Sequence, residues 1–430
     1  MLSPAMAETR EVTQRDAAAP AAWMNETNAF PFDPRDPAFR ANPYPTYDAL
    51  RESSPVLQTQ LGLLVLSRQR DCVELLHHTQ TSTDQRNSTL FQAYLKTLDF
   101  DPFEGREPSF LFLDPPDHTR LRGLVSNAFT PRRVRDLLPR VYEIVDELLD
   151  AALAKGGMEA VEEFAYLVPV KVICLLLGVP EADNDQFKAW SRQLARGLDP
   201  DFMLDDETRH SMEEAGEALR SYFEDLIAER TRHPGDDMLS ALIEAEQEGE
   251  KLSHGELLST LGLLLIAGHE TTVNLIGNGL LQFSRHPDQY AKLRSDPAAF
   301  KKGAVEEVLR FDPPVQITGR IAMTELTFDD HTLEPGAQGL CVIGGANRDP
   351  EEFGDTAGAF DITRSNNNHV SFGAGIHFCI GAPLARMEAQ AAFEGFAARV
   401  EDFELTEEPT YREAFVLRGL GKLPIIVRSN

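Results

Sequence analysis

The chain has 430 residues, of which 42% are hydrophobic, and its formal net charge at pH 7 is -28. A charge of this sign disfavours nucleic acid and anionic membrane surfaces as partners, and no apolar run approaches the roughly 20 residues that a membrane-spanning helix needs. The cysteines have no paired spacing, which indicates a reducing compartment without a disulfide framework: Cys72, Cys174, Cys341 and Cys379.

Residues 1–30 are rich in Ala, Glu and Thr with charges throughout, which excludes a signal peptide and predicts a flexible tail. Residues 31–430 contain no linker-like stretch and no internal repeat, so we expect them to form a single domain. These features together predict a soluble, cytoplasmic protein.

The domain begins with a Pro-rich stretch, followed by a predicted helix from about Pro45 to Glu52. Apolar and polar residues alternate from Val56 to Leu66, a pattern typical of a β-hairpin. Helical periodicity follows from Gln69 to His78. Residues 79–110 have no clear periodicity, and a loop of that length in a compact protein is usually functional.

A further helix is predicted to start at Asp117, because Pro followed by Asp is a typical helix start. His118 and Arg122 are four residues apart, so they share one face of this helix. Two cationic side chains on one face can bind two carboxylates of a ligand. From the residues alone, a solvated basic face is the simpler interpretation.

Residues 131–250 predict several helices with apolar stripes, interrupted at 178–180 and again at 197–206. Phe202 and Met203 lie in the second interruption. They are equally consistent with local packing and with contact to a bound molecule.

The longest predicted helix runs from Ser253 to about Arg285. Ser253 and Glu256 form a capping-box pattern at its start, and Pro287 ends it. Such a helix is roughly 48 Å long, enough to cross the molecule.

The middle of this helix reads Ala267-Gly268-His269-Glu270-Thr271-Thr272, a polar group within an apolar helix. Glycine costs about 1 kcal/mol of helix stability relative to alanine, and threonine hydroxyls that bond to backbone carbonyls bend helices. We therefore expect a local opening of the helix here. The zinc motif H-E-x-x-H fails, because Val273 stands where the second histidine would be. From the residues alone, a helix kink is the simplest interpretation.

Beyond this helix, Glu307 and Arg310 have the i, i+3 spacing of what is usually a surface ion pair. Strands are predicted at Ile321–Met323, Leu326–Phe328, Gly339–Ile343 and Leu423–Val427.

One cysteine near the C-terminus stands in a glycine-rich loop, Phe372-Gly373-Ala374-Gly375-Ile376-His377-Phe378-Cys379-Ile380-Gly381, before a helix predicted to start at Ala382. We expect the positive end of that helix and unpaired backbone N–H groups to lower the pKa of the Cys379 thiol. A thiolate in such a loop suits the axial position of a large flat metal macrocycle.

Other roles for Cys379 stay open on residue types alone. A buried apolar side chain is the commonest role of a lone cysteine and weighs about as much as haem ligation. A nucleophile would need a base and an orienting partner. Zinc would need more ligands at short spacing than His377, and a dinucleotide motif fails because Phe378 replaces its third glycine.

The pattern Phe372-x-x-Gly375-x-His377-x-Cys379-x-Gly381 resembles the haem-binding signature of the cytochrome P450 family, and further motifs of that family recur in order from about residue 30. The resemblance implies a mainly α fold: a single large helical cytochrome P450 domain with small β-sheets. It also implies that haem b lies between the long central helix and the helix after the Cys loop, with Cys379 as the metal ligand.

The resemblance implies roles for the other site residues as well. Thr271 is expected to steady bound oxygen, and Glu270 to relay protons to it. The expected contacts to the haem include its propionates and come from His118, Arg122, Ala267, Arg320, Phe372, Gly373, His377 and Gly381.

In the family, the E-x-x-R pair is buried and ties its helix to the loop before the cysteine, so we carry this structural role to Glu307 and Arg310. The family usually has Arg or His before the following Phe-Asp pair, where this chain has Ala359. We therefore expect Arg348 or Arg364 to be the third partner.

The implied function is a haem-thiolate monooxygenase that inserts one atom of O₂ into an apolar or amphipathic small molecule. The chain has no flavin or iron–sulfur domain, so electrons are expected from a separate ferredoxin and ferredoxin reductase, and the protein is expected to be a monomer. A haem sensor or electron carrier, or a peroxide-driven hydroxylase of the same fold, is the alternative, and Glu270 and Thr271 argue against both.

Two more expectations concern surfaces. The substrate is expected to be selected by residues near 79–110, 190–212, 314–318 and 411–418. A basic patch is expected to dock an acidic ferredoxin. It consists of these arginines: Arg120, Arg122, Arg132, Arg133, Arg135, Arg140 and Arg386. The alternative is that they only balance neighbouring acidic residues.

Overall fold

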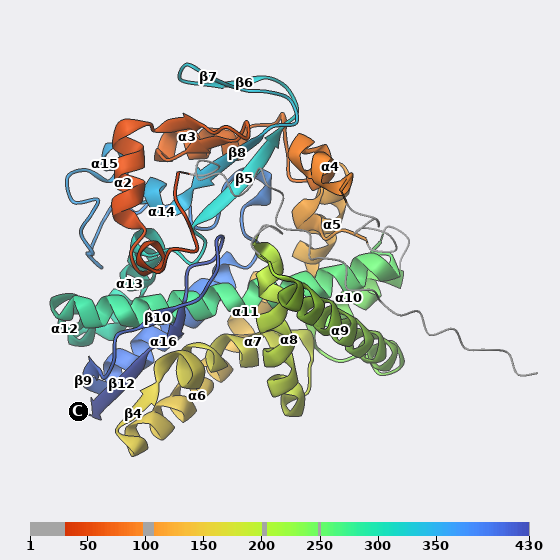
Figure 1. The fold of residues 1–430 in the computed structure, drawn as a ribbon. Coiled ribbons are helices and arrows are strands. Elements are labelled where there is room, and N and C mark those ends of the chain that lie inside the picture. Colours follow the sequence, from red (N-terminus) through yellow and green to blue (C-terminus); the bar gives the residue numbers. More distant parts are fainter. Residues whose placement is uncertain (1–30, 98–106, 200–203, 248–250, 430) are drawn as a thin grey trace, which may run out of the picture.

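The computed structural model describes residues 31–97, 107–199, 204–247 and 251–429. The predicted tail and the pair Phe202 and Met203 lie outside the described residues. Figure 1 shows a helical part crossed by one long helix, with the larger β-sheet and a few short helices on one side of it.

The helices are α1 Pro37–Ala41, α2 Tyr44–Ser53, α3 Gln69–His77, α4 Thr89–Leu95, α5 Asp117–Ala128, α6 Pro131–Lys155, α7 Leu167–Leu177, α8 Asn184–Leu194, α9 Asp206–Arg232, α10 Met238–Gln247, α11 His254–Arg285, α12 Pro287–Ser295, α13 Pro297–Phe311, α14 Ile343–Ala346, α15 Pro350–Phe353 and α16 Ala382–Arg399.

The strands are β1 Val56–Gln58, β2 Leu64–Leu66, β3 Thr81–Ser82, β4 Gly157–Glu159, β5 Ile317–Ala322, β6 Leu326–Phe328, β7 His331–Leu333, β8 Gln338–Val342, β9 Val400–Leu405, β10 Thr410–Tyr411, β11 Leu420–Lys422 and β12 Pro424–Ser429.

The larger sheet has the strand order β1-β2-β8-β5-β3, and β12 lies between β4 and β9 in a second sheet. The predicted hairpin is confirmed as the antiparallel pair β1 and β2, with Val56 opposite Leu66. In the register of β5 and β8, Arg320 lies opposite Gly339, while Ser82 of β3 lies opposite Ile321. This register brings Arg320 near the segment that follows β3.

Helix α11 is confirmed as the central element. Its start has the predicted capping box, in which the Ser253 hydroxyl accepts from the Glu256 N–H at 3.0 Å and the Glu256 carboxylate accepts from the Ser253 N–H at 2.7 Å. The expected opening near Gly268 is wrong: the helix is continuous from His254 to Arg285. Thr271 does bond to the Ala267 carbonyl at 2.9 Å, without breaking the helix.

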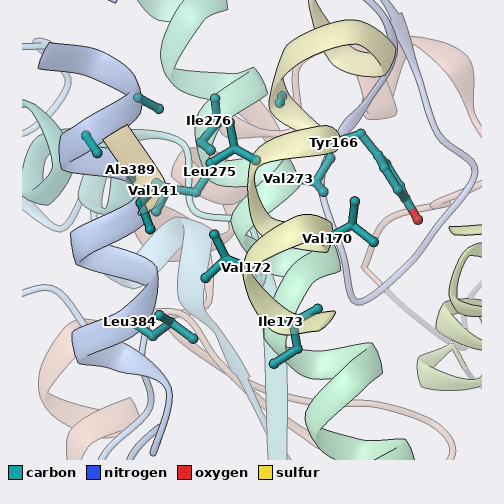
Figure 2. Close-up of a cluster of buried hydrophobic side chains, with 14 of the residues drawn as sticks. Val141, Tyr166, Val170, Val172, Ile173, Val273, Leu275, Ile276, Leu384 and Ala389 are labelled. Carbon is teal, nitrogen blue, oxygen red and sulfur yellow. The ribbon is translucent and has the colours of Figure 1, made fainter. Parts of the chain in front are cut away.

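The main core forms where α7 packs between α11 and α16 (Figure 2). Val172 and Ile173 of α7 lie among Leu275 of α11 and Leu384 of α16. The two long helices approach closely because Gly279 has no side chain: a Cβ there would lie 2.2 Å from the Phe393 ring. This packing fixes the position of α16, and with it the Cys loop, relative to α11.

Some expectations about secondary structure are wrong. Residues 79–110 are not all loop, since they contain β3, a 3₁₀ turn and α4, with 98–106 outside the described residues. Strand β7 was not expected, and β5 starts at Ile317 rather than at Ile321. Within the described residues, no helix combines the length and apolarity needed to cross a membrane.

Candidate active site

The Cys loop joins a 3₁₀ turn, Gly375–His377, to the N-terminus of α16. The Cys379 N–H donates to the Phe372 carbonyl at 2.9 Å and closes the loop. Gly373 and Gly375 both have φ +68°, the left-handed region that favours glycine. A Cβ on Gly375 would also lie 2.4 Å from the Leu76 carbonyl oxygen. The loop therefore packs directly on the end of α3.

The Cys379 residue is exposed as a whole, but its sulfur lies in a partly enclosed position. Burial raises the pKa of the thiol, against the opposing influence of the Gly381 and Ala382 N–H groups and of the Arg122 and Arg386 charges. The helix N-terminus acts in the predicted direction, yet burial outweighs it in the protein alone. The predicted effect of the N–H groups is therefore present, but the net pKa of the thiol is raised. A metal ion would stabilise the thiolate directly.

Positive and imidazole side chains gather beside this loop. The His118 and His377 rings lie 4.2 Å apart, and both nitrogens of the buried His118 ring lack a hydrogen-bond partner in the described residues. Burial lowers the pKa of His377 most, and the charges of Arg320, His118 and Arg122 add to this effect, so that the pKa is about 3. Burial likewise lowers the pKa of Arg320, which is 7% exposed.

This cluster has few acidic partners. Arg320 donates to its neighbour's carbonyl at 2.8 Å, and Arg122 donates to the Phe378 carbonyl. Asp114, a carboxylate whose charge acts on His118 and Arg320, already accepts from Ser82 and from the Thr83 N–H. Two arginines and an imidazole whose ring nitrogens have no partner among the described residues fit a ligand that carries carboxylates.

One face of α11 is open at its middle. Ala267 is exposed and Thr271 half-buried, although His269, Glu270 and Thr272 beside them are buried. Protein atoms therefore leave this face uncovered at the small Ala267 side chain. An open apolar surface on α11, a thiol flanked by backbone N–H groups and a cluster of two arginines and two imidazoles together fit haem, a flat metal macrocycle with two propionates.

Glu270 points into a polar network rather than toward the open face. Its carboxylate accepts from Arg412 at 2.7 Å and from the Tyr166 hydroxyl at 3.5 Å. The His269 ring lies 3.5 Å from the same carboxylate and 3.3 Å from the Tyr166 hydroxyl, which also contacts Ser191 at 3.0 Å. Figure 2 shows this hydroxyl directed away from the aliphatic cluster.

This network sets the charge of Glu270. Burial raises the pKa of the carboxyl, but His269 and Arg412 lower it by more, to about 2. No local pattern pointed to Arg412 or Tyr166, because both are far from Glu270 in the chain and neither belongs to a motif. Their role follows from the fold alone.

The Glu307 and Arg310 pair is fully buried, as the resemblance implies, with two bonds at 2.7 and 2.8 Å. Arg364 is the third partner, with its Nε 3.2 Å from Glu307. The Ala359 carbonyl accepts from Arg310 at 2.8 Å. The alternative partner is wrong: the Arg348 guanidinium stacks 3.3 Å from the Tyr44 ring centre and 3.6 Å from that of Phe311.

Fewer arginines are available in the expected basic patch than the sequence indicates. Arg120 pairs with Glu256, and Arg386 pairs with Glu306 at 2.7 Å. Arg140 pairs with Glu143 at 3.1 Å and with Glu147 at 3.0 Å, while Arg122 turns toward the Cys loop. The arginines that remain at the surface lie at the start of α6: Arg132, Arg133 and Arg135.

Known proteins are similar to this chain over most of its length. The family model described as Cytochrome P450 matches residues 85–415. The chain is 40% identical to "Cytochrome P450 107B1" of Saccharopolyspora erythraea over 403 residues, covering 91% of this chain and 96% of that protein. It is 39% identical to "Vitamin D(3) 25-hydroxylase" of Pseudonocardia autotrophica over 395 residues, covering 90% of this chain and 94% of that one.

Solved structures agree. Ligand-free CYP164A2 of Mycobacterium smegmatis superposes with a TM-score of 0.84 at 43% identity, over 91% of this chain and 98% of that one. P450BioI, solved with hexadec-9Z-enoic acid ligated acyl carrier protein, has a TM-score of 0.81 at 37% identity, over 91% of this chain and 100% of that one. The chain therefore belongs to the cytochrome P450 family of haem-thiolate monooxygenases.

Proposed function

We propose that Cys379 is the thiolate ligand of haem b in this monooxygenase, and that the haem lies between α11 and the N-terminus of α16. The observation that carries the proposal is the Cys loop. The loop places the Cys379 sulfur beside the Gly381 and Ala382 N–H groups, next to the cluster of His118, His377, Arg122 and Arg320.

The remaining contacts follow from this placement. His118, Arg122, Arg320 and His377 hold the two propionates, because the two arginines and the unpartnered ring nitrogens of His118 can bond to carboxylates there. The other haem contacts are the small or flat side chains around the plane: Ala267, Phe372, Gly373 and Gly381.

When bound, the haem supplies one-electron and oxygen chemistry, with electron density from the thiolate favouring O–O cleavage. The residues of α11 supply protons. The Thr271 hydroxyl lies at the open face of the helix and can hold a water or hydroxyl by hydrogen bonding. The Glu270 carboxylate, one residue away but turned into the polar network, can exchange protons with such a water only after it turns from Arg412.

The substrate is an apolar or amphipathic small molecule, in keeping with relatives that are named for vitamin D3 hydroxylation or solved with fatty acids. Electrons arrive from a separate carrier, and we propose a ferredoxin with its reductase, docked near the start of α6. We further propose a monomer that works in the cytoplasm, with residues 31–430 as one domain.

Ligation is tested by Cys379→His. The reduced carbon-monoxide complex of the wild type should absorb at the wavelength that gives the family its name, and the variant should absorb where histidine-ligated haems do. Cys341→Ser is the matched control, because Cys341 is a buried thiol of β8. If the spectrum of the variant matched that of the wild type, Cys379 would be excluded as the haem ligand.

A further inference from the structure

We propose that Asp199 is a positioning residue that joins the segment after α8 to residues 414–417 and so limits the size of substrate that can enter. The proposal rests on the proposed pocket over α11, since both segments are expected to border the substrate. It concerns a contact that is visible only in the fold, because the two segments are more than 200 residues apart in the sequence.

Asp199 is 6% exposed and spans the two segments with one carboxylate oxygen. Its Oδ1 accepts from two consecutive backbone amides, the Phe415 N–H at 2.8 Å and the Val416 N–H at 3.0 Å. Two amide donors that converge on a buried carboxylate make a strong, geometrically specific connection.

Residues 415–417, at one end of this connection, are fixed to the larger sheet. The Phe415 side chain packs in a cluster with Ile317 of β5 and Val342 of β8. The Gln316 N–H donates to the Val416 carbonyl at 2.9 Å, and Leu417 forms a bridge with Val315. The backbone at 415–417 is therefore continuous with the sheet that carries Arg320.

Asp199, at the other end of the connection, belongs to the helical part of the molecule. Asp199 follows the 3₁₀ turn Ala195–Leu198, which packs on α11 and α9. The Asp199 N–H donates to the Arg196 carbonyl at 3.0 Å, and the Arg196 guanidinium lies 3.6 Å from Oδ2. Burial raises the pKa of Asp199, and the two amides and Arg196 oppose this effect.

Asp199 thus links a segment that packs on α11 to a segment anchored in the sheet. With the link intact, a bulky ligand cannot enter between them without breaking two hydrogen bonds. A small ligand needs no such opening. The inference predicts a size-dependent barrier controlled by one carboxylate.

Three variants separate the possibilities. Asp199→Asn keeps a carbonyl oxygen that can accept from both amides. Asp199→Ala removes the acceptor. Asp205→Ala is the control, because Asp205 caps α9 through the Thr208 N–H at 2.8 Å and makes no bond to residues 414–417 in the described part of the chain.

The first measurement is hydrogen exchange of the holoprotein over a peptide containing Phe415 and Val416. We expect exchange on the order of tenfold faster in Asp199→Ala than in the wild type, and nearly unchanged in Asp199→Asn and Asp205→Ala. Equal exchange in Asp199→Ala and the wild type would overturn the connection. This arm does not depend on catalysis or on where a substrate binds.

The second measurement is stopped-flow binding of imidazole and of econazole, followed by the haem absorption shift. We expect association and dissociation of econazole on the order of tenfold faster in Asp199→Ala, with imidazole rates unchanged. Equal acceleration of both ligands, or of neither, would overturn the size barrier. Failure of the wild type to give any shift would instead contradict the proposed haem pocket.

Discussion

At the scale of single residues, Thr271 and Glu270 are adjacent in sequence but face different surroundings. Thr271 lies at the open face of α11, whereas Glu270 is buried and charged. The two can act in one proton route only if water or a side-chain rotation connects them. This separation gives each residue its own test.

Thr271→Ala should leave substrate affinity nearly unchanged and lower the product formed per NAD(P)H by about tenfold or more, because the hydroxyl that we propose to support proton delivery is lost. The lost reducing equivalents should appear as hydrogen peroxide. Thr272→Ala is the control, since Thr272 is buried and bonds only weakly to the Gly268 carbonyl at 3.4 Å. Full coupling in Thr271→Ala would exclude the hydroxyl from the route.

Arg412→Gln should raise the pKa of Glu270, because a charge that lowers it is removed. In the wild type, the folded pKa of about 2 is below the unfolded value of 4.5, so the stability it contributes is present above pH 4.5 and is lost as pH falls toward 2. In the variant the folded pKa lies closer to 4.5, so this loss is smaller and is complete at a higher pH. Urea unfolding should therefore show the full difference between the two proteins near pH 7, and the difference should shrink as the pH falls below 4.5 toward 2. Arg412→Lys should behave more like the wild type, and a pH-independent difference would contradict the assignment.

At the scale of elements, the parts that follow local rules were predictable. The capping residues Ser253 and Glu256 and the Asp117 helix start depend on neighbours within four residues, and both helices begin as expected. The motif around Cys379 likewise specified a glycine-dependent loop before a helix. The short α4 and β7 were missed because their sequences lack strong periodicity.

Contacts between distant elements were not predictable from local pattern. The partner of Glu270 comes from the segment after β10, and the acceptor for the Phe415 amide comes from the turn after α8. The continuous helix at Gly268 is a similar case. A Cβ at Gly268 would lie 3.0 Å from Ile173 of α7, so tertiary packing holds the helix together where propensity favoured an opening.

The third partner of the buried pair gives a test at this scale. Arg364→Ala should cost about 3 kcal/mol of unfolding free energy, because Glu307 would lose one of two buried cations. Arg364→Lys should recover only part of this, since lysine cannot donate in a planar fork. Arg192→Ala, which removes a surface pair with Glu162, should cost under about 1 kcal/mol. Equal costs for Arg364→Ala and Arg192→Ala would contradict a structural role for Arg364.

At the scale of the whole molecule, the chain carries an excess of acidic residues, and an arginine cluster interrupts them at the start of α6. Arg132 is 86% exposed with Asp136 at 3.6 Å, and Arg133 is 3.9 Å from Asp236. Such loose pairs leave positive charge available at the surface. An acidic carrier could therefore be steered to this part of the molecule.

Arg132→Glu together with Arg133→Glu should slow the association of a ferredoxin about tenfold or more at low salt, with a smaller effect at high salt because ions screen the interaction. The carbon-monoxide spectrum and substrate affinity should not change. The measurement is the rate of first electron transfer against ferredoxin concentration at two ionic strengths. Reversal of the pair Arg209 and Arg220 on α9 is the control, and identical effects of the two reversals would exclude docking at α6.

The contacts of the C-terminal segment also constrain when the protein can fold during synthesis. Arg412 neutralises Glu270, and Arg418 pairs with the buried Asp312 at 2.7 Å. During translation, both arginines are synthesised long after the carboxylates that they neutralise. The helical part can begin to pack as it emerges, but each of the two buried acids lacks part of its counter-charge until residue 418 has left the ribosome. Nascent chains that stop before Arg412 should thus remain sensitive to protease even though α11 is complete.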